Sequence, residues 1–429
     1  MVNDINDFNA ISVCQGVREG KRLVCKEPVT DPEIKKETVK LLNEALNRIE
    51  KWKTYSTWWI DELYIKNMKE FRKKLKNLKN IEDKYPEEII NNVKTIVESL
   101  LNYVYINLRS YWENKIGLEI EKLIERIRNG KVEVVMNKTE KTLMMHIYED
   151  NVELKINKIY NSNSVIIQLV LNGMKGVHIN IPNVFNELLN KEEYEKFIKE
   201  VLIPMEGGFA MTDESINKNK PSMKTSRLWQ LLLWSLIYPG EIYIIIDTIN
   251  VNKSGESIIY YLRANSHTSF KQKIPEMIKN FDDTAFLNFL FTAILGDGDI
   301  LIRRRKEGYT SFEIRITAGG GKVNALRSIL EKFDSMKIKY NIGRQKGGIK
   351  IIIESNYAVE LARKIINALP PIMKALFDVL ETFGLNKWSK LKQIANARLS
   401  FKLGNSQVNI LGIGFTISIT PSGYIVLVV

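Results

Sequence analysis

The sequence predicts an α+β protein with several domains, and three observations along the chain carry that prediction. Apolar residues recur at helical spacing over most of residues 33–128. Residues 131–181 instead form short runs of alternating or continuous apolar character between Asn, Gly and Ser breaks, which is typical of an antiparallel meander. Residues 284–369 then read as helix, two strands, helix, two strands, helix. A chain of 429 residues has room for two to four domains.

Composition indicates a folded protein with a polyanionic partner. The formal net charge is +13, and residues 301–350 contain thirteen Lys or Arg against four Asp or Glu. No apolar run reaches the ~18 residues of a membrane span, and the N-terminus lacks the apolar core of a signal peptide. We therefore expect a cytoplasmic protein without a membrane partner. Two cysteines exclude a disulfide scaffold and a multi-cysteine zinc site, and we expect Cys14 and Cys25 to be inert.

The first part of the chain predicts a helical N-terminal region over residues 1–130. Residues 1–30 have weak periodicity and are expected to form an extended or poorly ordered arm. Asp31-Pro32-Glu33 opens a helix, because Asp is a good N-cap and Pro suits the first turn. The region reads as a helical hairpin or small bundle. Its role stays open between a DNA-binding appendage, a dimerisation arm and a scaffold.

Residues 131–205 are expected to form the antiparallel meander followed by one helix, and residues 206–224 a polar linker. His146 and His178 fall inside predicted strands without neighbouring Cys or His residues in sequence. We therefore interpret both histidines as structural strand residues rather than metal ligands.

The acidic turn at residues 296–299 gives the strongest functional signal. Asp282 begins a helix whose apolar residues cover two sides, so the helix should be buried. One of those sides carries the small residues Thr292, Ala293 and Gly296, which let another backbone approach closely. The sequence Gly296-Asp297-Gly298-Asp299 then ends the helix before a strand. Carboxylates at a helix C-terminus are electrostatically disfavoured, and a divalent cation would reverse that penalty.

The nine residues Leu290–Gly298, which read LFTAILGDG, resemble the signature of the LAGLIDADG homing endonucleases. Asp297 falls on the metal-binding acid of that signature and Gly298 on its closing glycine, whereas Phe291 and Thr292 depart from the usual alanine and glycine. The resemblance covers roughly residues 225–385. It implies an αββαββα unit, which we place at residues 282–395, followed by C-terminal strands over residues 396–429.

Residues 225–281 look like a degenerate first copy of the same unit. Leu232–Ile242 superimposes on Leu290–Ile300 with a shift of 58 residues. Pro239 then occupies the place of Asp297, and Glu241 meets Asp299. The copy lacks the last two strands and helix, and chance similarity of two helix–turn–strand units is the alternative.

The resemblance implies Mg²⁺ held by paired acids at the feet of two such helices. Asp297 is expected to be one metal ligand and a catalytic residue. Either Glu241 supplies the second acid, or a homodimer pairs two copies of Asp297. In the family a lysine on a late strand neighbours the scissile phosphate, and Lys346 and Lys350 both qualify as that catalytic lysine.

The resemblance also implies a β-sheet saddle against double-stranded DNA. Strand alternation predicts that polar side chains face the nucleic acid while isoleucines face the helices. The expected DNA-binding residues are Arg303, Arg304, Arg305, Arg315, Thr317, Lys337, Lys339, Asn341 and Arg344.

The leading hypothesis is therefore a DNA-binding protein of the LAGLIDADG type, a Mg²⁺-dependent double-strand endonuclease from an archaeal mobile element. The alternatives are an inactive DNA-binding regulator with the same saddle, an RNA-binding maturase-like protein, and an interaction scaffold in which the acidic stretch is only a turn.

Overall fold

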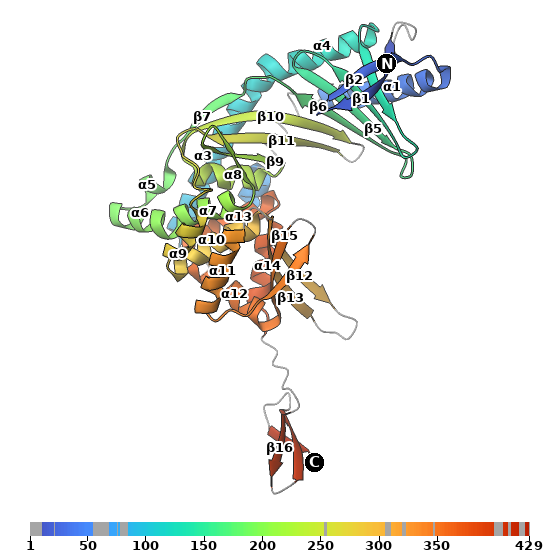
Figure 1. Ribbon diagram of the computed structural model, residues 1–429. Coiled ribbons are helices and arrows are strands. Elements are labelled where there is room, and N and C mark those ends of the chain that lie inside the picture. Colours follow the sequence, from blue (N-terminus) through green and yellow to red (C-terminus); the bar gives the residue numbers. More distant parts are fainter. Residues whose placement is uncertain are drawn as a thin grey trace.

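The computed structural model is a mixed α+β protein with a large antiparallel sheet, which confirms the predicted fold class at that level (Figure 1). It describes residues 11–20, 22–54, 68–74, 76–77, 85–252, 255–304, 310–319, 323–345, 348–398, 406–410, 413–419 and 425–428. Among these residues, no helix combines the length and the apolar character that a bilayer crossing requires.

The N-terminal region contains two strands that the sequence did not predict. Where an extended arm was expected, β1 (Ser12–Glu19) and β2 (Arg22–Pro28) form an antiparallel hairpin. β1 also pairs in parallel with β3 (Glu133–Lys138), so the hairpin extends the meander instead of lying free. The arm prediction was wrong because β1 buries Val13, Cys14 and Gly16 rather than alternate residues, and β2 buries Leu23 alone, which leaves no two-residue period in the sequence.

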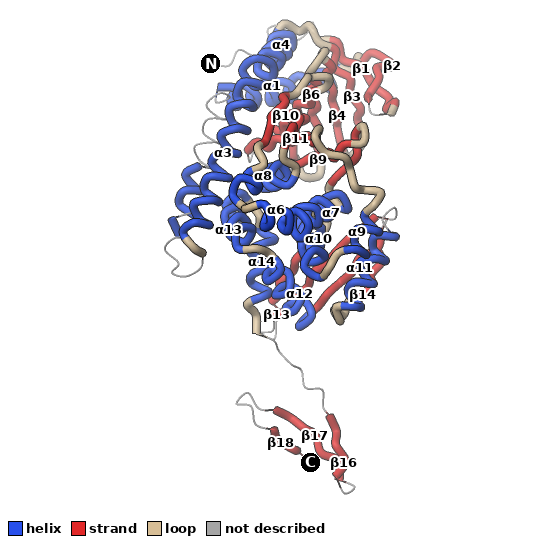
Figure 2. Tube along the Cα trace, turned by 90° about the vertical axis from the view of Figure 1, so that its left-hand side faces the viewer, coloured by secondary structure: helices blue, strands red, loops and turns tan. Residues whose placement is uncertain are grey.

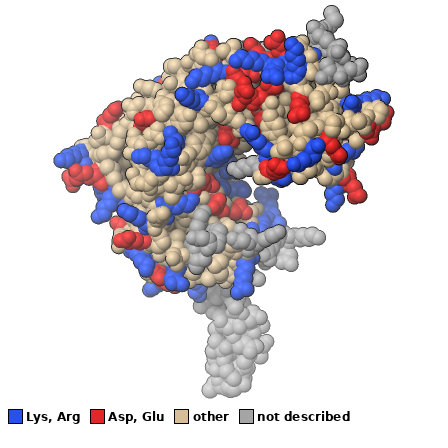
Figure 3. All heavy atoms as spheres, turned by 45° about the horizontal axis from the view of Figure 1, so that its top comes forward, with Lys and Arg blue, Asp and Glu red and all other residues tan. Residues whose placement is uncertain are grey.

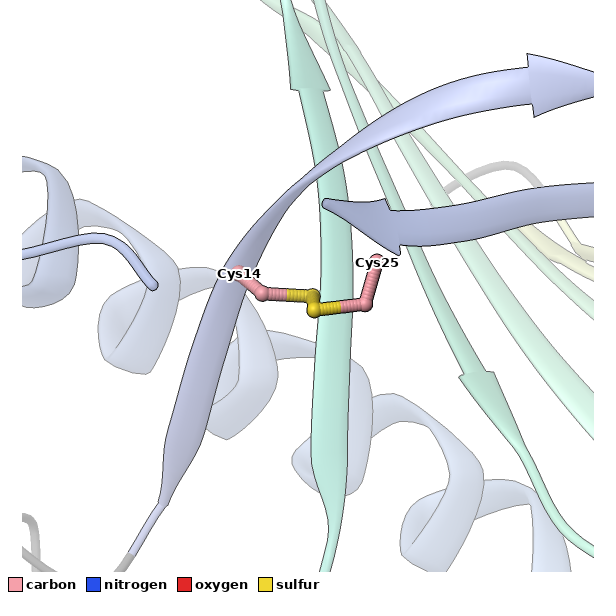
Figure 4. Close-up of a disulfide and its surroundings, with 2 residues drawn as sticks. All are labelled: Cys14 and Cys25. Atoms are coloured by element: carbon pink, nitrogen blue, oxygen red, sulfur yellow. A yellow bond between two sulfur atoms is a disulfide. The ribbon is translucent and has the colours of Figure 1, made fainter. Parts of the chain in front are cut away.

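The same hairpin joins the two cysteines. Cys14 and Cys25 form a disulfide between β1 and β2 (Figure 4). They pack with Leu23 and Val135 in a small apolar cluster beside the main core. The sequence did not predict this pairing, and both cysteines are ordered rather than disordered. Cys14 is paired across the strands with residue 28 rather than with Cys25, and the bulge after Gln15 shifts that register.

Helices cover one face of the meander. Those of the N-terminal region are α1 (Pro32–Thr54), α3 (Glu87–Tyr111) and α4 (Gly117–Arg128), with a π-helical turn at Trp112–Ile116. The strands that follow β3 are β4 (Thr142–Tyr148), β5 (Val152–Ile159), β6 (Ser164–Leu171) and β7 (Val177–Ile181). Alternate strand residues such as Leu143, Met145 and Ile147 are buried. The 3.6-residue and two-residue periods of the sequence thus correspond to the two layers.

After the meander the chain repeats one order of elements twice. Short helices α5 (Val184–Leu188) and α6 (Lys191–Phe197) and a π-helical turn (Ile198–Leu202) lead into the first set. That set comprises α7 (Ile203–Met211), β8 (Glu214–Asn217), β9 (Lys220–Thr225), α8 (Leu228–Ile237), β10 (Gly240–Asn252), β11 (Gly255–Ala264) and α9 (Ile274–Asn280). The second comprises α10 (Asp283–Leu295), β12 (Asp299–Arg304), β13 (Thr310–Gly319), α11 (Val323–Ser335), β14 (Asn341–Gln345), β15 (Gly348–Glu354) and α12 (Ser355–Ala368).

The two sets also have the same strand order. The first runs β8-β9-β11-β10 and the second β12-β13-β15-β14, all antiparallel. In the first set β10 also pairs with β6 and β7, so the four strands of this set belong to an eleven-stranded sheet. The second set stays a separate four-stranded sheet. The two sheets lie on either side of a central layer that includes α7 and α10 (Figures 1 and 2).

This arrangement corrects two sequence-based boundaries. The stretch predicted as a linker, residues 206–224, forms most of α7 and the whole β8–β9 hairpin. The predicted first copy began one helix too late, because the helix equivalent to α10 is α7 and not α8. The error has a physical source, since Gly207-Gly208 lowers helix propensity and the hairpin that follows is rich in Asn, Ser and Lys.

The chain ends with two further helices and a small sheet. α13 (Pro371–Leu380) and α14 (Asn386–Ala395) complete the helical layer. β16 (Ser406–Ile410), β17 (Ile413–Ile419) and β18 (Ile425–Val428) form a three-stranded antiparallel sheet.

Candidate functional site

Two helices meet along their small-residue faces and bring their C-termini together. A Cβ atom added to Gly208 of α7 would lie 2.0 Å from Thr292 Oγ1 and 2.5 Å from the backbone oxygen of Phe289, both on α10. A Cβ added to Gly296 would lie 2.2 Å from Thr212 Oγ1. Only glycine permits such separations. The prediction that Thr292, Ala293 and Gly296 form a face for a second backbone is confirmed, and α7 is the helix that occupies it.

The close packing places one aspartate of each helix at a common foot. Asp213 follows α7 and Asp297 follows α10, each two residues beyond the last helical residue. The Asp213 carboxyl carbon would lie 3.3 Å from a Cβ on Gly296, which is the residue before Asp297. The two carboxylates are close enough that Asp297 raises the pKa of Asp213. Two acids of one chain therefore converge at the point where both helices end.

Asp213 is held in place by neighbours from α8 and β9. Gln230 Nε2 donates to Asp213 Oδ2, and Thr225 Oγ1 donates to Gln230 Oε1 at 2.7 Å. Burial is the largest effect on Asp213 and raises its pKa, and Asp297 raises it further. Gln230, Lys387 and Arg227 act in the opposite direction. The net effect is a pKa of Asp213 above its usual value, with burial as the main cause.

A lysine from α14 supplies one positive charge at the same foot. Lys387 Nζ donates to the backbone oxygens of Ile294, Leu295 and Gly296 at 2.9, 2.7 and 2.7 Å. These are carbonyls that a helix C-terminus leaves without partners. Burial, followed by Arg227, lowers the pKa of Lys387 to about 8. Asp213, Asp299 and Asp297 raise it, so this ammonium belongs electrostatically to the acidic site.

Two further carboxyl groups are buried next to the Asp213 side of the site. Glu214, the residue after Asp213, accepts a hydrogen bond from Trp234 Nε1 at 2.8 Å. Burial raises its pKa to about 7, against the hydrogen bonds from Tyr238 and Trp234. Glu206 on α7 is 6% exposed, and burial, followed by the charge of Glu214, raises its pKa well above the usual range. The two buried acids beside Asp213 therefore bind protons more readily than exposed carboxyl groups do.

The predicted second acid, Glu241, lies elsewhere. It is exposed at the start of β10, where His178 Nδ1 lies 2.5 Å from its Oε1 and Asn265 Nδ2 donates to the same oxygen at 2.7 Å. The carbonyl of Pro239 lies 2.7 Å from His267 Nε2. Because α7 rather than α8 packs on α10, the Pro239 turn does not correspond to the Asp297 turn, and the acid that lies beside Asp297 is Asp213 rather than Glu241. The strand role of His178 stands, with a carboxylate partner.

The second sheet turns its polar side away from the helices, as strand alternation predicted. Ile314 and Ile316 of β13 are fully buried, while Arg315 and Thr317 lie on the opposite face. Lys350 of β15 stands across from Thr317 on that open face. Lys346, Arg305 and the turn that contains Arg305 lie outside the described residues.

The remaining predicted DNA-binding residues divide into three groups. Arg303 lies on the open face and forms a 3.5 Å ion pair with Glu313, which also pairs with Arg315. Asn341 begins β14 and donates to Glu354 Oε2 at 3.2 Å. The third group is Arg304 and Arg344, which are exposed but alternate with the residues of the open face.

Lys337 and Lys339 were expected among the polar strand residues that face DNA, but neither is a strand residue. β14 begins only at Asn341, and Lys337 has a φ of 57° in the turn after α11. Lys339 Nζ lies 5.4 Å from the centre of the Tyr357 ring. Both lysines line a pocket of about 740 Å³ together with Tyr357 and Glu354. Their charges therefore border the sheet instead of facing outward from it.

Charge on the described open face is mixed. Arg303, Arg315 and Lys350 share it with Asp299, Glu313 and Glu354. On the side shown in Figure 3, basic and acidic side chains are likewise interspersed. The described part of this face therefore carries paired charges of both signs.

The donor set at the foot suits a hard cation. Carboxylate and backbone oxygens are the ligands that Mg²⁺ prefers, and it retains several waters when one or two carboxylates hold it. The aspartates do not form a preassembled three-carboxylate group: in the described part of the chain, the group of three with ligand atoms within 4.8 Å of one another is Cys14, Cys25 and Glu133. The cysteines of that group are joined in the disulfide.

Sequence reasoning missed Asp213, Gln230 and Lys387. Asp213 had a usable signal, since Gly207-Gly208 precedes Thr212-Asp213 at the spacing that separates Thr292 from Asp297. Lys387 had none, because its partners are backbone carbonyls about 90 residues earlier in the chain.

No family model and no curated protein sequence matches this chain. Two solved structures are similar to it at a low level. The homing endonuclease I-WcaI bound to its DNA recognition sequence has 15% sequence identity and a TM-score of 0.28, and the match covers 44% of this chain and 93% of that one. The meganuclease I-SmaMI bound to uncleavable DNA has 13% identity and a TM-score of 0.25, covering 47% of this chain and 99% of that one.

Proposed function

We propose that this protein binds double-stranded DNA against the open faces of its two sheets and hydrolyses phosphodiester bonds with Mg²⁺ at Asp213 and Asp297. The observation that carries the proposal is the convergence of these two acids at the feet of a tightly packed helix pair. Two like-ordered sheets flank that pair. A pseudo-twofold arrangement of this kind suits a ligand that is itself twofold, such as a duplex with antiparallel strands.

Each residue of the foot has a distinct part in the proposed chemistry. Asp213 and Asp297 hold the cation, which when bound polarises the phosphate and activates water. Gln230 fixes the orientation of the Asp213 carboxylate through its hydrogen bond. Lys350 on the open face is the candidate for contact with a backbone phosphate, and Arg303 and Arg315 are candidates for contacts with phosphates or guanine edges.

Because both acids come from one chain, the proposal does not need a homodimer to pair them. The proposal therefore favours a single-chain site over the alternative in which two chains each contribute Asp297. An RNA target and a regulator that binds DNA without cutting remain as outcomes of the test, with the same foot and the same open faces.

The experiment uses purified protein with supercoiled plasmid that carries the genomic flank of its own gene, with and without Mg²⁺. Wild type should cut only with Mg²⁺, and Asp213→Asn and Asp297→Asn should each lose cutting. Glu241→Gln is the matched control and should cut like wild type.

Salt-sensitive binding without cutting would support the regulator instead. Preferential binding of an RNA carrying the same flank would support the maturase-like alternative. Loss of cutting in Glu241→Gln together with retention in Asp213→Asn would overturn the assignment of the acid pair.

A further inference from the structure

The two feet of the acidic site are capped in chemically different ways. At the foot of α10, the ammonium of Lys387 donates all three hydrogen bonds to the carbonyls of Ile294, Leu295 and Gly296 at 2.7–2.9 Å. At the foot of α7, the neutral hydroxyl of Thr212 donates to the carbonyl of Gly208 at 2.9 Å. The side chain of a lysine therefore caps one helix end, and a neutral hydroxyl caps the other.

The lysine cap lies directly before Asp297, one of the two proposed metal ligands. Gly296 is the last of its three carbonyl partners and directly precedes Asp297. Three hydrogen bonds to consecutive carbonyls fix the direction in which the chain leaves α10, and hence the position of the Asp297 carboxylate. The ammonium also opposes the partial negative charge of the helix end, which by itself disfavours an aspartate there.

Lys387 comes from outside the repeated element order. It lies on α14, and it is partly buried beside the foot rather than exposed on the helix surface. A lysine whose donors are all used by backbone carbonyls cannot reach out to bind a phosphate as well. Its geometry is therefore that of a residue acting on the site from within.

We propose that Lys387 is a positioning residue for the Asp297 half of the site and makes the two halves unequal. The proposal rests on the function proposed above. Lys387 holds the Asp297 turn in place while its charge weakens cation binding at the foot. In the Asp213 half, Thr212 caps the helix end and Gln230 orients the carboxylate, so Lys387 acts there through its charge and not through hydrogen bonds. We therefore expect the two DNA strands to be cut by half-sites with different requirements.

The test compares Lys387→Met with Lys387→Arg, which keeps the charge, and with Lys390→Met, which removes an exposed lysine from the same helix. The first readout is calorimetric titration of the full-length protein with magnesium chloride alone. Loss of one positive charge beside the two carboxylates should tighten Mg²⁺ binding by roughly tenfold in Lys387→Met. Lys387→Arg and Lys390→Met should bind like wild type.

The second readout is the rate of cutting of each strand, followed with a duplex labelled at both ends. Lys387→Met should slow one strand by about tenfold or more and accumulate nicked duplex, and the slowed strand should be the one most affected by Asp297→Asn. Tighter ion binding with slower cutting of one strand is a split that general destabilisation does not produce. Thermal unfolding of each variant checks that the fold persists.

Equal slowing of both strands, or unchanged Mg²⁺ affinity in Lys387→Met, would overturn the role of Lys387. A wild-type protein that binds Mg²⁺ but cuts neither strand would overturn the proposed nuclease function, and the affinity comparison alone would then decide the role of Lys387. Absence of Mg²⁺ binding in both wild type and Lys387→Met would overturn both proposals.

Discussion

Replacing Gly208 by alanine should separate the two central helices and destabilise the protein. The added Cβ would lie 2.0 Å from Thr292 Oγ1, 2.5 Å from the oxygen of Phe289 and 2.8 Å from the nitrogen of Ala293. The hydroxyl could rotate away, but the other two atoms belong to the backbone of α10. Relief therefore requires the helix axes to move apart by several tenths of an ångström.

The size of the effect follows from two opposing terms. Overpacking of a well-filled core costs about 1–3 kcal/mol, and two contacts with backbone place this site at the upper end. Alanine recovers up to about 1 kcal/mol of helix propensity relative to glycine. We expect a net loss of about 2 kcal/mol in the free energy of unfolding.

Gly207 provides a matched control in the same turn of α7. A Cβ there would have its nearest contact at 3.2 Å, with the Cδ2 atom of the Phe289 ring, which can shift without backbone movement. Gly207→Ala should therefore change the free energy of unfolding by less than about 1 kcal/mol. Urea unfolding followed by circular dichroism measures both variants. A Gly208→Ala protein within 0.5 kcal/mol of wild type, roughly the usual size of a surface substitution effect, would refute the close packing of α7 on α10.

Three further predictions concern stability. Glu206→Gln should stabilise the protein more at pH 8 than at pH 5. Burial and Glu214 raise the pKa of Glu206 in the folded protein, so the free energy of unfolding of the wild type falls as pH rises above the unfolded pKa of about 4.5. Urea unfolding at both pH values measures the difference. Reduction of the Cys14–Cys25 disulfide, which closes an 11-residue separation, should lower the free energy of unfolding by roughly 2–3 kcal/mol, and a Cys14→Ser, Cys25→Ser double variant should not respond to reductant. Asp378→Ala should cost about 1–3 kcal/mol, because it removes the acceptor of the buried indole N–H of Trp388, while Lys392 keeps its ion pair with Glu381; Lys390→Met should leave the melting temperature unchanged.

The sequence predicted those parts of the fold whose signals are local. The buried helix ending at Leu295, its small-residue face, and the alternation of β13 could all be read from periodicity, because burial there follows from the chain's own repeat. The turn at Gly296-Asp297 was visible for the same reason. The β1–β2 hairpin was not, because it gains its stability from pairing with β3, more than 100 residues away.

The second acid was missed for a related reason. α7 contains two adjacent glycines, which propensity treats as breakers, yet these glycines allow the contact with α10 that stabilises the helix. A search for a copy of the apolar α10 sequence therefore found α8, which is apolar because it is buried, instead of α7. Close packing of two helices requires that both helix faces fit each other, and the sequence pattern of one helix describes only its own face.

The two halves of the acidic site differ in the elements that surround them. The first set of strands is stabilised along its outer edge by β6 and β7, which pair with β10, while the second set ends at β14. The halves therefore differ in their surroundings, although both deliver an aspartate to the same foot. Gln230 orients one aspartate and Lys387 holds the turn of the other. Substitutions at Gln230 and Lys387 should thus affect different half-sites, whereas substitutions at Gly208 or Gly296, where the helices touch, should affect both together.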